Sequence, residues 1–163
     1  MVKLKDIVSI TKGKKHQEVE ISINANRYIQ IADLSSDESL KYTVEKGVEV
    51  DKNDLIIAWD GANAGKVGYN LDGIIGSTLA RLRILNSNIL PSYLFRFLDS
   101  QFENIKSKRT GATIPHVNGA ELRNLPIPLP PLPQGRRIAE FHQVSGGLPP
   151  SSLVRAVSIT FSL

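Results

Sequence analysis

The stretch LIIAWDGANAGKVGYN, residues 55–70, joins a continuous apolar run to a glycine-rich turn and a second short apolar segment. A short run that is apolar throughout is typical of a strand buried on both faces. A phosphate-binding loop needs four residues between its glycines and a serine or threonine after its lysine. Here three residues separate Gly61 from Gly65, and Val67 follows Lys66. The stretch therefore predicts a strand, a hairpin-like turn and another strand, and not a nucleotide site.

Strand patterns also occur on either side of this turn. Residues 27–34 alternate apolar and polar side chains, and residues 79–85 place Arg81 and Arg83 together on one face. Further short strands are expected at 8–11, 47–50 and 66–69. The first half of the chain is therefore predicted to form a sheet.

Helical spacing begins near residue 90. Pro91 suits the first position of a helix, where the missing N–H costs nothing. Apolar side chains then recur on one helical stripe, at Leu94, Leu98, Phe102 and Ile105. Ser100 is the expected break between two helical pieces, and Asn118 with Glu121 predicts a further one-turn helix. Prolines exclude residues 125–133 from a sheet interior and predict an edge strand or extended strap.

Composition restricts the class of protein. A chain of 163 residues, 41% hydrophobic and 22% charged, is typical of a globular domain with its own core. No apolar stretch approaches the ~20 residues that span a bilayer, and the first residues lack the apolar centre of a secretory signal. The absence of cysteine excludes disulfides and thiolate zinc sites. A cytoplasmic location without membrane association is therefore expected.

The positive charge is concentrated in two clusters. The formal net charge is +4, from 20 lysines and arginines against 16 acids. Lys12, Lys14 and Lys15 form one cluster and KSKR at 106–109 forms the other, both in segments expected to be loops. A lysine on a loop is most often only solvated. Two such clusters beside ordered elements nevertheless favour a surface that follows a phosphate backbone.

The sequence predicts no catalytic centre. His16, His116 and His142 lie in separate contexts without the spacing of metal ligands, and no serine sits in a nucleophile elbow. The chain also lacks the Asn-Pro-Pro-aromatic tetrad and the glycine-rich cofactor loop of a methyltransferase. Asp60 is expected to support the glycine turn through its own backbone. We therefore expect a non-catalytic protein with no metal and no cofactor.

Six segments follow one another as in a target-recognition domain of type I restriction-modification specificity subunits: LKDIVSITKGK, YIQIADL, DLIIAWDGANAGKVG, LPSYLFRFLDS, GATIPHVNGAEL and LPIPLPPLPQGRRIAEF. The chain resembles this family over about residues 3–142, most specifically in GATIPHVN and in the proline run that leads into a helix. The resemblance implies a compact α/β fold of mixed α+β type, with a twisted mixed β-sheet, a few helices and loops that bind duplex DNA. In the family, two such domains are joined by paired long helices, and each reads half of a split target. Partner modification subunits methylate adenine, and a nuclease subunit joins them.

The resemblance also implies which segments lie near DNA: the loop 12–16, the turn 63–66 and the loop 106–116. Phosphate contacts are expected from Lys14, Lys15, Lys106, Lys108 and Arg109. Base or groove contacts are expected from Asn63, Lys66, Arg81 or Arg83, because an amide can read adenine and a cation can reach guanine or phosphate. Lys12, Thr110 and His116 complete the expected DNA-binding set. Residues 110–116 equally suit a structural role, because Pro115 and the cap that follows hold the return of the chain to the sheet.

The resemblance divides the chain into a recognition domain at 1–133, a short remnant of the long pairing helix at 134–144 and an atypical tail at 145–163. Gly135 departs from the Glu-Gln pair usual after the proline run and weakens the helix start by up to ~1 kcal/mol relative to alanine. Because VSGG then shortens the helix, half of a specificity subunit at most is expected. The expected partners are duplex DNA, a modification subunit, a restriction subunit, and a second half-subunit or copy. The alternative hypothesis is a truncated remnant that folds but acts only as an interaction module or inactive fragment.

Overall fold

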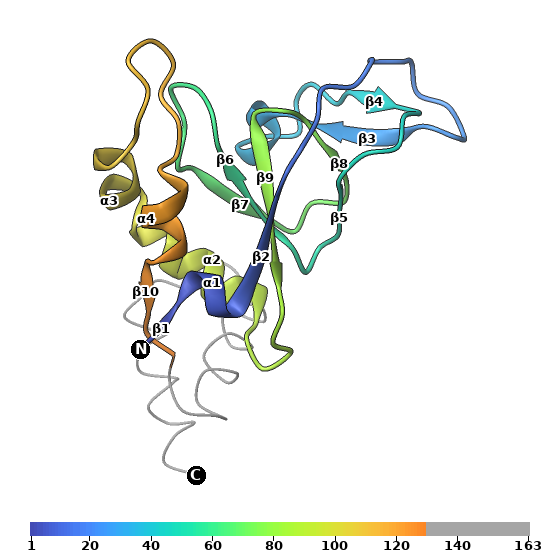
Figure 1. Ribbon diagram of the computed structural model, residues 1–163. Helices are drawn as coiled ribbons and strands as arrows, with labels where there is room; N and C mark the ends of the chain where they lie inside the picture. The colour runs from blue at the N-terminus through green and yellow to red at the C-terminus, as the bar shows by residue number, and fades with distance from the viewer. Residues whose placement is uncertain (130–163) are drawn as a thin grey trace.

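The computed structural model describes residues 1–129, in which the strands form three sheets (Figure 1). The first sheet is antiparallel and has the order β2–β9–β6–β7, from β2 (Val8–Lys12), β9 (Leu79–Ile84), β6 (Leu55–Ala58) and β7 (Val67–Tyr69). The second includes a parallel β3–β8 pair and has the order β4–β3–β8–β5, from β4 (Tyr42–Thr43), β3 (Asn26–Ile29), β8 (Gly73–Ile75) and β5 (Glu49–Val50). The third pairs β1 (Val2–Lys3) with β10 (Pro126–Ile127). The mixed α/β class is confirmed, but the strands divide among several sheets instead of forming one.

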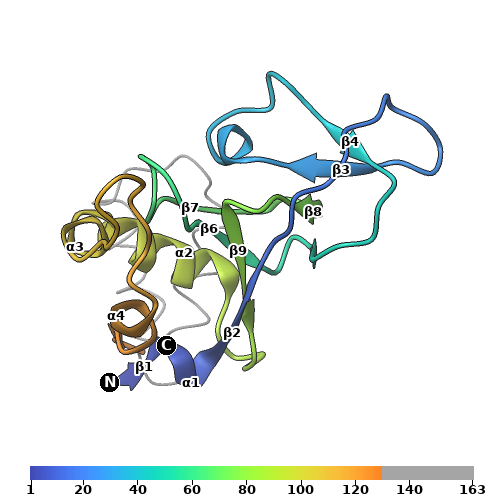
Figure 2. The same cartoon turned by 45° about the horizontal axis from the view of Figure 1, so that its top comes forward.

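Strand β6 lies between two hydrophobic cores. Leu55 and Ile57 pack into a cluster that includes Leu94 of a helix, whereas Ile56 and Ala58 pack into a second cluster with residues of the other four-stranded sheet. Figure 2 shows helix α2 on one side of the first sheet and strands β3 and β8 on the other. Because successive side chains of a strand point to opposite faces, a strand between two cores must be apolar at every position. This explains why residues 55–58 are all apolar.

Among residues 1–129 the chain forms four α-helices, and the three after residue 90 lie at the predicted positions. They are α1 (Leu4–Ile7), α2 (Pro91–Ser100), α3 (Phe102–Ser107) and α4 (Gly119–Arg123), with one 3₁₀ helix, η1 (Ile31–Leu34). Helices α2 and α3 meet at Gln101, next to the expected break, and Leu94, Leu98 and Ile105 are buried on the predicted stripe. Asn118 caps α4 by accepting the Glu121 N–H at 3.2 Å.

The strand predicted at 27–34 is wrong beyond Ile29, where the chain turns into η1. Asp33 explains the change. Its carboxylate accepts the Gln30 N–H at 2.6 Å and a guanidinium N–H of Arg27 at 3.0 Å. A side chain that bonds nearby backbone in this way stabilises a turn at the expense of a strand ladder. The sequence also gave no indication of β8.

The proline run begins as a sheet edge, as predicted. Strand β10 pairs with β1, and the Tyr93 hydroxyl of α2 donates a hydrogen bond to the Pro128 carbonyl. The strap is thus fixed to both the N-terminal strand and a helix. The predictions for 130–133, for the helix at 134–144 and for the tail at 145–163 lie outside the described residues.

Candidate nucleic-acid interface

The glycine-rich turn closes a hairpin between β6 and β7, as predicted. The φ angles of Gly61 and Gly65 are +100° and +105°, in the left-handed region that favours glycine. Ala58 accepts the Gly65 N–H at 2.8 Å and donates its own N–H to the Lys66 carbonyl at 2.7 Å. Asn63 lies between the two glycines of this turn, and its side chain is exposed.

The loop after α3 is closed at its base by an antiparallel pair. The Thr110 N–H donates to the His116 carbonyl at 3.0 Å, and the His116 N–H donates to the Thr110 carbonyl at 2.7 Å. Gly111 has a φ of +95°, and a Cβ at this position would lie 2.2 Å from the carbonyl oxygen of Ile114. The chain therefore doubles back tightly within the loop.

The loop and the glycine turn lie side by side in both views (Figures 1 and 2). They are tied by backbone and side-chain hydrogen bonds: Gly61 N to Pro115 O (2.8 Å), Val117 N to Trp59 O (2.8 Å) and Arg109 Nη1 to Ala62 O (2.9 Å). Two segments that are distant in the sequence thus form one structural unit.

Asp60 connects the loop at 12–16 to the glycine turn and the loop at 106–116. Its carboxylate forms an ion pair with Lys12 Nζ at 2.6 Å and a hydrogen bond with His116 Nδ1. Burial opposes ionisation of this carboxyl group, but the bonds and charges of Lys12 and His116 outweigh burial and lower the pKa of Asp60 below its ordinary value. The expectation that Asp60 supports its own turn is therefore corrected, because its side chain holds three segments together.

Lys14 and Lys15 come shortly after Lys12 in the same segment. Both side chains are exposed, and neither has an ion-pair partner among the described residues. The next residue, His16, anchors their segment. Its buried ring forms a hydrogen bond between Nδ1 and Glu45 Oε2 (3.0 Å), and its backbone N–H donates to the Tyr28 hydroxyl oxygen at 3.0 Å. Two free cations are thus held on a fixed backbone.

The cations of the second cluster differ in their contacts. Lys106 is exposed, with its ammonium 5.8 Å from the centre of the Phe102 ring. Lys108 forms an ion pair with Glu121 at 3.0 Å, and both side chains are about half exposed. Of the two lysines, Lys106 has the charge that is less compensated.

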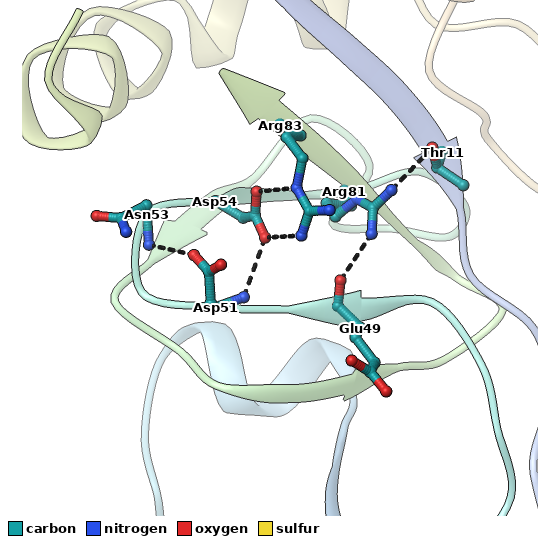
Figure 3. A network of polar contacts seen from close by, with 7 residues as sticks. All are labelled: Thr11, Glu49, Asp51, Asn53, Asp54, Arg81 and Arg83. Carbon is teal, nitrogen blue, oxygen red and sulfur yellow. Dashed lines mark hydrogen bonds and ion pairs between the residues drawn. The ribbon is translucent and has the colours of Figure 1, made fainter. Parts of the chain in front are cut away.

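The guanidinium groups of Arg81 and Arg83 bind within the fold (Figure 3). Arg81 Nη1 donates to the Glu49 carbonyl at 2.8 Å, which links the two four-stranded sheets. Arg83 donates two hydrogen bonds, at 2.9 and 2.8 Å, to the buried carboxylate of Asp54, and these bonds raise the pKa of Arg83. In the register of β2 with β9, Arg83 lies toward the end of the sheet away from Lys12.

Sequence reasoning missed the partner of Lys66. Its ammonium donates a hydrogen bond to the Ser35 hydroxyl, so the glycine turn also contacts the chain after η1. No pattern in the sequence pointed to Ser35, because the contact depends on how the two sheets pack. The described residues contain no cluster of three or more potential metal-ligating side chains and no helix long and apolar enough to cross a membrane.

The fold and the loops define a class of protein: the chain belongs to the family of type I restriction modification DNA specificity domains, whose family model matches residues 1–144. It is 32% identical over 146 residues to the type I restriction enzyme MjaVIII specificity subunit of Methanocaldococcus jannaschii. That match covers 86% of this chain and 34% of the relative, so the chain spans about a third of the relative's length.

Solved structures show the same fold. The HsdS subunit from Thermoanaerobacter tengcongensis matches with a TM-score of 0.68 and 23% identity, over 95% of this chain and 39% of that one. The S subunit of the type I restriction-modification system from M. genitalium matches with a TM-score of 0.67 and 20% identity, over 88% and 37% of the two chains. Both are about two and a half times as long as this chain, and the likeness extends over most of the chain.

Proposed function

We propose that this chain recognises a short, specific sequence of duplex DNA for a type I restriction-modification system. The observation that carries the proposal is the convergence on Asp60 of three cation-bearing segments, in a chain that belongs to the DNA specificity family. Cations that contact the phosphate backbone of DNA supply affinity, and polar side chains at turns read base edges. A rigid platform that presents both kinds of side chain suits this task.

The contacts suggest how the proposed DNA-binding residues divide their work. Lys14, Lys15 and Lys106 contact phosphates, because they lie on the predicted DNA-facing loops, are exposed and have no ion-pair partner among the described residues. Asn63 reads a base edge from the exposed turn. Six other residues of the predicted set hold the loops that carry these groups through the bonds described above: Lys12, Lys66, Lys108, Arg109, Thr110 and His116. Arg81 and Arg83 bind within the fold instead.

We further propose that the chain performs no bond chemistry and directs partner subunits to half of a bipartite target in the cytoplasm. These partners are a modification subunit that methylates DNA, a restriction subunit, and a second recognition half or second copy of this chain. Co-purification with a modification subunit tests this assembly, and failure of the full chain to form a complex would favour the inactive-fragment hypothesis.

DNA recognition is tested by measuring binding of the full chain to a pool of random duplexes over a range of salt concentrations. The variant Lys14→Ala/Lys15→Ala should reduce the slope of log K against log salt by roughly 2, because about 0.9 counterions are released per phosphate contact. The matched control is Lys5→Ala/Lys52→Ala, which removes two exposed lysines from other parts of the fold. Equal slopes in the two variants would contradict the proposed interface, and equal affinity of the wild type for all duplexes would contradict specific recognition.

A further inference from the structure

Ile114 is an apolar side chain held out of the fold. It is 55% exposed, and neither hydrophobic core includes it. Single exposed apolar residues are ordinary on protein surfaces, and Leu85, at 63% exposed, is another in this molecule. What distinguishes Ile114 is the closed backbone of the loop that carries it and the basic residues that flank this loop.

The loop fixes Ile114 in position. The Thr110–His116 pair closes its base, and the left-handed Gly111 lies so close to the Ile114 carbonyl that a Cβ would not fit between them. Pro115 restricts Ile114 to extended conformations and is bonded through its carbonyl to Gly61. Ile114 therefore cannot fold back into the core while these bonds persist, and its position relative to the glycine turn is set.

The loop that carries Ile114 is flanked by basic residues, of which Lys108 is ion-paired with Glu121 and Lys12 with Asp60. Lys108 and Arg109 precede the loop, and Arg109 is bonded to the glycine turn beside it. Lys12 reaches the same point through Asp60, which also bonds His116. An apolar side chain on a loop flanked by basic residues is unfavourable for packing against an apolar protein surface but suits the groove of a polyanionic duplex, where phosphates flank base edges that include thymine methyl groups.

We infer that Ile114 enters a groove of the DNA and makes an apolar, base-dependent contact, so that it is a specificity-determining residue of the domain. This inference rests on the proposed function. An isoleucine side chain offers methyl groups to a thymine methyl or to a partly opened base step, and neither contact involves a hydrogen bond or an ion. The contact therefore contributes affinity that salt does not weaken.

The experiment compares the full chain with Ile114→Ala, Ile114→Val and Leu85→Ala, each by selection from a pool of duplexes with a randomised central segment and by salt titration on the selected duplex. Ile114→Ala should weaken binding on the order of tenfold, relax the preference at one or two base positions, and leave the salt slope unchanged. Ile114→Val should retain most of the affinity, and Leu85→Ala should match the wild type. Thermal melting verifies that each variant is folded, as expected for exposed positions.

Three outcomes would overturn the inference. If Ile114→Ala selects the same sequence with the same affinity, Ile114 does not read DNA while the proposed function stands. If that variant instead loses co-purification with a modification subunit, the exposed side chain contacts protein. If its salt slope changes, the substitution acts through the neighbouring cations. Failure of the wild type itself to select any sequence would overturn the proposed function and not this contact alone.

Discussion

The ion pair of Arg83 and Asp54 gives an asymmetric prediction, because its partners differ in exposure. The Asp54 side chain is 3% exposed and the Arg83 side chain is 43% exposed. The carboxylate receives two guanidinium N–H groups and the Asp51 N–H, the last at 3.0 Å (Figure 3). Removing one partner of a buried pair is costly when the remaining charge stays buried, and much less so when that charge can reach water.

The substitution Arg83→Met keeps most of the side-chain stem but leaves the Asp54 carboxylate buried with the Asp51 N–H as its one remaining donor among the described bonds. The expected loss is about 3 kcal/mol of the free energy of unfolding, at the low end for broken buried pairs because Arg83 is partly hydrated already. Asp54→Asn keeps an acceptor for the backbone N–H and leaves Arg83 free to turn to solvent. Its expected cost is about 1 kcal/mol.

Equilibrium unfolding in urea at neutral pH measures both costs, with the salt slope of DNA binding as a second measurement. The double variant should be more stable than Arg83→Met alone, because Asp54→Asn removes the charge that the first substitution leaves unpaired. The salt slope should stay unchanged in all three variants, since Arg83 has a structural role. The reasoning is refuted if Asp54→Asn costs more than Arg83→Met, or if Arg83→Met lies within about 0.5 kcal/mol of the wild type.

Two further predictions concern the loops. Burial raises the pKa of Asp60, but its lysine and histidine partners lower it more, so the ionised carboxylate stabilises the fold above the ordinary pKa and this stabilisation is lost as pH falls through the folded pKa. In urea unfolding, Asp60→Asn should therefore cost about 1 kcal/mol at pH 7 and less below about pH 4. A cost that does not change with pH would contradict this. Gly47→Ala would place a Cβ 2.3 Å from Nε2 of the buried His16 and should cost about 2 kcal/mol, measured by thermal unfolding. The control Gly61→Ala meets no atom within 4 Å and should cost about 1 kcal/mol through its positive φ, so equal losses would contradict the steric explanation.

The local patterns of the sequence predicted the elements that depend on local rules. The run at 55–58, the proline at the start of α2 and the asparagine cap of α4 each specify an element without reference to distant residues. Residues 27–34 show where this fails, because alternation alone does not reveal that Asp33 will bond backwards to Gln30.

The candidate interface was predictable in its segments but not in its assembly. Glycines and lysines marked the turns, yet nothing in the spacing showed that Asp60 would bond both Lys12 and His116. The alternation of Arg81 and Arg83 placed them correctly on one face of a strand, but their partners come from the second sheet and from the turn before β6. Tertiary partners of this kind follow from sheet packing, which a single sequence does not encode in any local pattern.

Three arginines bonded within the fold contrast with the two exposed lysines at 14 and 15. Arg27, Arg81 and Arg83 donate to carboxylates or to a backbone carbonyl inside the fold, where a planar guanidinium can make several directed bonds at once. Lys14 and Lys15 stay in water on an anchored loop, where a compact hydrated charge can follow a phosphate backbone without a fixed geometry. The net charge of the chain counts these internally bonded and solvent-exposed cations equally, and so it does not measure how many cations remain available to a polyanion.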